Sequence, residues 1–125
     1  MGKFVGIACL SLCLLFSSCN LVGDFLFESI DRTIQYEISG TASSVDIDFR
    51  NYNGNNVKLY DISLPWSETI TVAIREFESF SPSIDVKNKG ETGYVIVEIW
   101  VDDELIKKDA GNKAASASVW VNYDE

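Results

Sequence analysis

The residue with the most specific chemistry in this chain is Cys19, which directly follows two serines. Lys3 gives a positively charged start, and residues 4–16 form an apolar run that leads into the serines. This order is typical of a secretory signal peptide, and the run is shorter than the roughly 20 residues of a membrane-spanning helix. Residues 15–19, Leu-Phe-Ser-Ser-Cys, resemble a bacterial lipobox, whose cysteine thiol receives a diacylglyceryl group. We expect a lipoprotein signal peptide over residues 1–18 and lipid attachment at Cys19; an ordinary signal peptide cleaved slightly later is the alternative.

Other residue types that carry chemistry are scarce. The chain has no histidine, which excludes Ser-His and Cys-His catalysis and metal binding by imidazole. Cys9 and Cys13 lie in the predicted signal peptide, and Cys19 is the predicted lipid site, so no thiol remains for a disulfide or a redox couple. We therefore expect no enzyme activity, no cofactor and no metal.

Acidic residues are numerous, but their positions favour solvated side chains over a metal site. Asp46 and Asp48 face the same side of one predicted strand, where they could share a calcium ion or simply face water. Asp102, Asp103 and Glu104 stand in a predicted hairpin turn, where aspartate is favoured for local backbone hydrogen bonds. The solvated interpretation is the simpler one for both groups.

Three aromatic residues are the candidates for a binding site. Trp100 and Tyr94 lie on the side of their strand opposite a valine row, and Trp120 lies opposite an alanine-valine row. If those strands are neighbours, the rings could form an outward platform for a carbohydrate or an apolar ligand. The alternative is that the rings only stabilise the sheet, since cross-strand aromatic pairs contribute about 0.2–1 kcal/mol.

The charge of the chain limits its partners. The formal net charge is -9 at pH 7, and loss of Lys3 with the signal peptide leaves -10 on the mature side chains. Such a surface repels nucleic acid and anionic lipid head groups. An acylated cysteine needs no basic patch, because two or more fatty acyl chains such as palmitate are enough for stable membrane attachment.

Hydrophobic residues alternate with polar ones from Thr33 onward, which predicts short strands separated by turns. The Asn53-Gly54 pair is a strong hairpin signal, and Pro65 ends a strand because it cannot donate a hydrogen bond. We expect an anchor and linker over residues 19–32, in which residues 22–30 could form a short helical turn. Residues 33–125 are expected to form an all-β, antiparallel sandwich of about seven to eight strands. The predicted inward rows are Ile34-Tyr36-Ile38, Val45-Ile47-Phe49, Ile70-Val72-Ile74, Ile84-Val86, Val95-Val97-Ile99-Val101 and Ala115-Ala117-Val119-Val121.

Several segments in order resemble the extracytoplasmic domain of the mycobacterial small membrane-protein family, MmpS. They are the segments YEISGTASS, VDIDF, LPWSET and VIVEIWVDDEL, followed by the alanine-rich final strand. The resemblance covers about residues 36–121, and the LPWSET run is its most specific part. It implies an immunoglobulin- or transthyretin-like sandwich that is tethered beside large exporters of lipids or siderophores. It implies no catalytic residues.

The chain departs from that family in two ways. Family members generally keep an uncleaved transmembrane helix, whereas this chain has the lipobox. Many also carry a cysteine near the positions of Val97 and Val119, and the resemblance implies that an apolar contact replaces this crosslink here. The changed anchor leaves open whether the exporter role applies to this chain.

Together these features predict a non-enzymatic, lipid-anchored protein of the cell envelope. It would act by contact with an envelope protein, as an accessory to a membrane exporter; a carbohydrate- or apolar-ligand-binding module that uses Trp100, Trp120 and Tyr94 is the alternative. Asn20 stands where aspartate retains some lipoproteins in the inner membrane, which favours an outer membrane facing the periplasm.

Overall fold

The computed structural model describes residues 28–123, and these residues form strands and no helix. No helix in this part of the chain is long and apolar enough to cross a membrane. The predicted signal peptide, the lipid site at Cys19 and most of the possible helical turn over 22–30 lie outside the described residues. The strands are β1 (Ser29–Gly40), β2 (Val45–Arg50), β3 (Asn56–Ile62), β4 (Trp66–Arg75), β5 (Ser79–Phe80), β6 (Ser83–Asn88), β7 (Val95–Val101), β8 (Glu104–Gly111), β9 (Ala114–Ser118) and β10 (Val121–Asn122).

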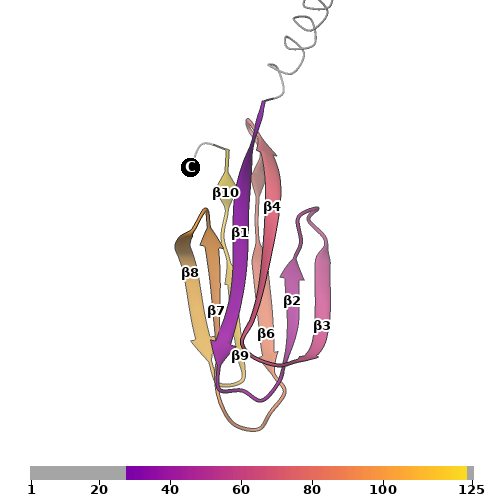
Figure 1. Cartoon of the computed structure of the whole chain (residues 1–125), viewed down its shortest axis with the longest axis vertical. Coiled ribbons are helices and arrows are strands. Elements are labelled where there is room, and N and C mark those ends of the chain that lie inside the picture. The colour runs from indigo at the N-terminus through magenta and orange to yellow at the C-terminus, as the bar shows by residue number, and fades with distance from the viewer. Residues whose placement is uncertain (1–27, 124–125) are drawn as a thin grey trace, which may run out of the picture.

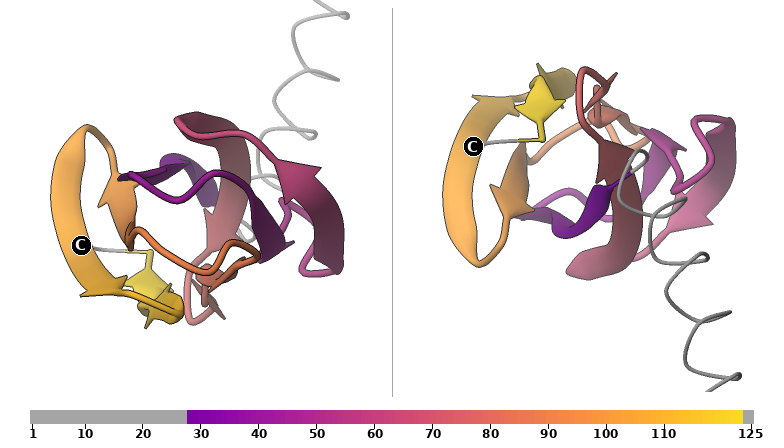
Figure 2. Two further views of the ribbon diagram at one scale, coloured as in Figure 1. Left: turned by 90° about the horizontal axis from the view of Figure 1, so that it is seen from below. Right: turned by 90° about the horizontal axis from the view of Figure 1, so that it is seen from above.

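Two four-stranded antiparallel sheets face each other (Figure 1). One sheet has the order β4-β1-β7-β8, and the other has the order β3-β2-β6-β9. The short strands β5 and β10 pair with each other in a separate two-stranded sheet. Seen along the strands, the two main sheets form opposite layers (Figure 2). The predicted all-β antiparallel sandwich is confirmed.

The core lies between the two sheets and consists of the alternating residues that the sequence pattern predicted. Ile34, Tyr36 and Ile38 of β1 are all at most 1% exposed, and the predicted inward residues of β2, β4, β6, β7 and β9 are also buried, except Val101, which is partly buried. The edge strands β3 and β8 contribute no fully buried residue. Burial of each large apolar side chain contributes roughly 1.5–3 kcal/mol. The Tyr36 hydroxyl donates a hydrogen bond to the Arg50 carbonyl at 2.7 Å, which satisfies the polar atom of this buried ring. Burial raises the pKa of the Tyr36 phenol.

The structure differs from the sequence prediction at both ends of the sandwich. β1 begins at Ser29, four residues before the predicted boundary, because residues 29–33 pair with the end of β4 from Thr71 to Arg75. The predicted final strand is interrupted at Val119 and Trp120. The Val119 N–H donates to the Pro82 carbonyl, and the chain then continues as β10 beside β5 instead of β6.

The two ends of the sandwich carry different structures. We call the end where β1 begins the entry end; it also carries the β4–β5 turn, the β7–β8 turn and β10. At the opposite end, β1 finishes at Gly40, whose φ is +125°. There the Tyr94 carbonyl accepts hydrogen bonds from the N–H groups of Thr41 and Ala42 at 3.0 and 3.1 Å.

The two lateral sides of the sandwich also differ. On one side the Asp109 carboxylate of β8 accepts a hydrogen bond from the Ser116 N–H of β9 at 3.0 Å, which links the edges of the two sheets. On the other side β3 is an edge strand, and its pairing with β2 shifts register between Val45 and Ile47. Asp61 has a φ of +55° beside this irregularity, and its N–H donates to the Asp46 carboxylate at 3.1 Å.

The register does not place Val97 and Val119 at the same level. Val97 pairs with Asp109 across β7 and β8, and the Asp109 carboxylate contacts the Ser116 N–H. Ser116 precedes Val119 by three residues, or about 10 Å along an extended chain. Val97 is fully buried, whereas Val119 is only partly buried. The apolar contact between Val97 and Val119 that the resemblance implies therefore stays a prediction.

Candidate functional site

The three aromatic residues that the sequence analysis selected do not lie on neighbouring strands. Trp100 lies on the outer side of β7 and Tyr94 directly precedes this strand, so the two residues are six positions apart, or about 20 Å along an extended chain. Trp120 follows β9, which belongs to the other sheet. The Trp100 ring is half-buried and its N–H donates to the Glu98 carboxylate at 3.2 Å. The condition under which the rings would form one platform is thus not met, and ligand binding by these residues stays a prediction.

Trp120 is the most exposed of the three rings, with 71% of its surface accessible. It borders a small cavity of about 230 Å³ that Val101, Ile106 and Val121 also line. Ile106 is 45% exposed on β8, so this side of the molecule presents two apolar residues to the solvent. The feature is compatible with one small apolar group and is smaller than a typical ligand pocket of 300–1,000 Å³.

The acidic residues have local partners. Asp46 forms an ion pair with Lys89 at 3.4 Å, and Asp48 accepts a hydrogen bond from the Asn56 amide at 3.1 Å. The Asp102 carboxylate accepts hydrogen bonds from Arg32 and Thr33 of β1. Within residues 28–123 there is no group of three or more acidic, histidine or cysteine side chains that could hold a metal ion.

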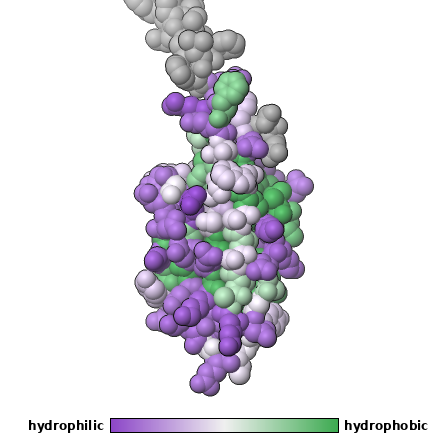
Figure 3. Space-filling view, turned by 180° about the vertical axis from the view of Figure 1, so that it is seen from behind, coloured by the Kyte–Doolittle hydropathy of each residue, from purple (hydrophilic) through white to green (hydrophobic). Residues whose placement is uncertain are grey.

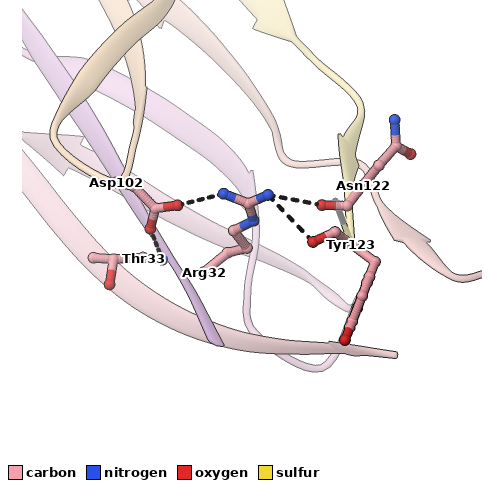
Figure 4. A network of polar contacts seen from close by, with 5 residues as sticks. All are labelled: Arg32, Thr33, Asp102, Asn122 and Tyr123. Atoms are coloured by element: carbon pink, nitrogen blue, oxygen red, sulfur yellow. Dashed lines mark hydrogen bonds and ion pairs between the residues drawn. The ribbon is translucent and has the colours of Figure 1, made fainter. Parts of the chain in front are cut away.

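Arg32 organises the entry end of the sandwich (Figure 4). Its guanidinium forms an ion pair with the Asp102 carboxylate at 2.7 Å, and a second nitrogen donates to the carbonyls of Asn122 and Tyr123 at 3.2 and 3.4 Å. The other Asp102 oxygen accepts the Thr33 N–H at 3.0 Å. One side chain therefore joins β1, the β7–β8 turn and the C-terminal segment. The Arg32 side chain is 13% exposed and its bonds to Asn122 and Tyr123 are partly buried, whereas the ion pair is open to water on its Asp102 side, which is 41% exposed.

Phe77 is the most exposed large apolar residue at this end. It occupies the β4–β5 turn between Glu76 and Glu78, is 97% exposed and has a φ of +69°. The Glu78 carboxylate accepts the Arg75 N–H at 3.0 Å, which closes the turn. Phe77 lines a cavity of about 440 Å³ together with Tyr123, so two aromatic residues border the same cavity at the entry end. Seen from behind, a small isolated apolar group is surrounded by hydrophilic side chains at this end of the domain (Figure 3).

A family model described as Mycobacterium membrane protein matches residues 25–121. The chain belongs to this family. The matched region includes both sheets of the sandwich and confirms the MmpS-like resemblance seen in the sequence. No curated protein matches the chain. Membership places this MmpS-like protein among membrane-associated proteins of the cell envelope.

Two residues that shape the entry end of the MmpS-like domain were not predictable from the local sequence pattern. Arg32 was assigned to a linker, because the apolar alternation becomes regular only at Ile34. Phe77 lies outside the inward row Ile70-Val72-Ile74 and was not selected. A large apolar residue flanked by two glutamates in a turn was the available signal, since turns are mostly polar.

The electrostatics of the entry end give the MmpS-like domain two shifted groups. The Thr33 N–H and the Arg32 guanidinium hold the pKa of Asp102 below its ordinary value. Partial burial, followed by the nearby carboxylates of Glu28 and Glu76, raises the pKa of the Tyr123 phenol. Tyr123 therefore remains a neutral hydrogen-bonding ring at physiological pH.

Asp102→Asn tests the ion pair through the pH dependence of stability. Because the folded-state pKa of Asp102 is depressed, its carboxylate stabilises the fold above the ordinary pKa of about 3.9, and this stabilisation is lost as the pH falls through the folded value. The Asp102 side chain is 41% exposed, which limits the effect. We expect the variant to lose about 1 kcal/mol of unfolding free energy at pH 7 and less at pH 3, because the Asp102 carboxylate becomes protonated as the pH falls through its depressed pKa.

Urea unfolding at the two pH values measures this difference. Asp103→Asn is the matched control, because Asp103 is the adjacent exposed residue with a similar backbone conformation, at a φ of +67°. It should change stability little at either pH. An Asp102→Asn deficit that is the same at pH 7 and pH 3 would contradict the assignment.

Proposed function

We propose that this protein is a lipid-anchored, non-enzymatic component of the cell envelope that acts through contacts with other envelope proteins, as an accessory to a membrane exporter. The observation that carries the proposal is the family match over residues 25–121, which includes the whole sandwich. The lipobox-like segment before Cys19 supports the anchor, and the absence of histidine supports a role without catalysis. Asn20 after the lipid site favours an outer membrane facing the periplasm.

Mass spectrometry of the protein purified from membranes tests the anchor. The expected product begins at Cys19 and carries two or three acyl chains. Cys19→Ala should prevent this modification and keep the signal peptide attached. A native N-terminus at Met1, or a free thiol at Cys19, would contradict lipid anchoring.

Site-specific photo-crosslinking in the native membrane tests the protein contacts. A photoreactive residue can replace exposed aromatic residues on different parts of the sandwich, such as Tyr60 on β3, Tyr94 at the end opposite the entry end, and Trp120. We expect one transmembrane or envelope protein to be captured from some positions and not from others. Equal, unselective capture from all three positions, or none, would argue against a specific partner.

A ligand-binding role is the second candidate, and the 71% exposure of Trp120 beside a small cavity that apolar and charged residues line favours it. Tryptophan fluorescence titrated with glycans tests this role. A saturable change that is lost in Trp120→Ala would support it. Trp100→Ala and Tyr94→Ala are the controls, because neither ring borders this cavity, and both variants should keep the change. A flat response would leave the contact role as the better explanation.

A further inference from the structure

Phe77 exposes an apolar ring at a position where the fold gains nothing from it. The ring is 97% exposed at the tip of the β4–β5 turn, so burial in this domain contributes almost nothing to its stability. Exposed Leu or Phe residues are common on protein surfaces and need no explanation when only exposure is considered. The backbone conformation of Phe77 makes this one different.

The backbone at Phe77 is strained. Its φ of +69° lies in the left-handed region, where a bulky residue is an outlier and where glycine or asparagine is preferred. A residue that adds strain and receives no packing in return is a feature that points to function. The turn would form more readily with asparagine, so the phenyl ring is the part that requires an explanation.

The position of Phe77 relative to the chain suggests what the ring contacts. It stands at the entry end, where residues 29–33 of β1 pair with the end of β4. Only residues 20–27 separate Cys19 from Glu28, and such a segment spans at most about 30 Å. An acyl chain on Cys19 would therefore hold the entry end near the membrane surface.

We propose that the entry end rests on a bilayer of zwitterionic phospholipid and that Phe77 inserts its ring into the interfacial layer. This inference rests on the proposed lipid anchor. Tyr123, which lines the same cavity, supplies an amphipathic ring of the kind that is enriched at membrane interfaces.

The charges beside Phe77 select the type of lipid. Glu76 and Glu78 flank the ring, and Glu28 lies close to Tyr123. In the head-group layer these carboxylates would be attracted by the ammonium groups of ethanolamine or choline lipids and repelled by anionic head groups. The surface therefore fits a neutral, zwitterionic membrane better than an anionic one.

Lipid-dependent quenching of a probe beside Phe77 tests the inference. The acylated full chain carrying Ser79→Cys is labelled with an environment-sensitive dye and placed in phosphatidylethanolamine–phosphatidylcholine vesicles that contain a shallow nitroxide lipid. Ser79 is exposed and two residues from Phe77, and its substitute is the only free thiol if Cys19 is acylated. We expect the emission of the dye to shift to the blue and to be strongly quenched by the nitroxide lipid. Because burial of one phenyl ring corresponds to about a ten- to hundredfold change in partitioning, Phe77→Asn should remove most of the quenching.

Controls separate this inference from the anchor itself. Asn112→Cys places the same probe in the β8–β9 turn at the opposite end, where no quenching is expected. Phe77→Asn should keep or raise the melting temperature, so a loss of quenching cannot be caused by unfolding. Addition of anionic lipid should weaken quenching of the Ser79→Cys probe.

Three results would overturn the inference, and they have different meanings. If the chain floats with the vesicles but the Ser79→Cys probe is unquenched, the anchor holds and the membrane contact of Phe77 is wrong. If the acylated chain does not float with the vesicles, the proposed anchor fails as well. If the probe is shielded in native membranes and remains exposed in protein-free vesicles, Phe77 contacts a protein and not lipid.

Discussion

Gly40→Ala should destabilise the domain by about 3 kcal/mol or more. Gly40 has a φ of +125°, and a Cβ atom there would lie 2.3 Å from the Tyr94 carbonyl oxygen. That oxygen accepts the N–H groups of Thr41 and Ala42, so the backbone cannot move away without loss of both hydrogen bonds. Urea unfolding, followed by tryptophan fluorescence, measures the change.

Gly54→Ala is the matched control for this prediction. Gly54 also has a positive φ, of +84°, but a Cβ atom there would meet nothing within 4 Å. Its substitution should cost only the strain of the left-handed conformation, about 1–2 kcal/mol. Equal losses in the two variants would show that the close approach to Tyr94 has no energetic importance.

Arg32→Ala should cost about 2–3 kcal/mol, the second largest effect that we expect. The substitution removes the ion pair with Asp102 and the hydrogen bonds to the carbonyls of Asn122 and Tyr123. Since the Arg32 side chain is 13% exposed, water replaces these contacts only in part. Hydrogen exchange should accelerate most at Val121–Asn122, and urea unfolding gives the overall loss.

Arg32→Lys separates charge from geometry. An ammonium group can still pair with Asp102, but it lacks the planar arrangement of donors that reaches the C-terminal carbonyls at the same time. We expect the unfolding free energy of Arg32→Lys to lie between that of the wild type and that of Arg32→Ala. A loss below about 0.5 kcal/mol in Arg32→Ala would contradict the role assigned to this network.

The sandwich was predictable because its strands obey strict alternation. Ile34, Tyr36 and Ile38 face the core as the period of two requires, and the Asn53-Gly54 turn joins β2 to β3 as expected. The break at Val119 was not predictable from the same rule, because Val121 continues the alternation on a strand that pairs elsewhere. Alternation reports which face is buried and does not identify the neighbouring strand.

The entry end was less predictable than the core. Arg32 acts through Asp102, 70 positions away in the sequence, and nothing in the local pattern links the two residues. The aromatic candidates were selected as outward-facing residues, and Trp120 and Tyr94 are indeed exposed. Their grouping into one platform failed because it depended on strand neighbours, which the topology places in different sheets.

The irregular pairing beside Asp61 has a consequence for a protein crowded onto a surface. Molecules confined to two dimensions meet far more often than in solution, and a straight outer strand could recruit the same strand of the next molecule into a growing ribbon. The Asp46 carboxylate of β2 accepts the Asp61 N–H of β3, and the backbone of Asp61 has a positive φ. The outer strand is therefore irregular and pairs less well with the same strand of another molecule. Lys58 adds a charge to the same strand, so each molecule can stay separate at high density.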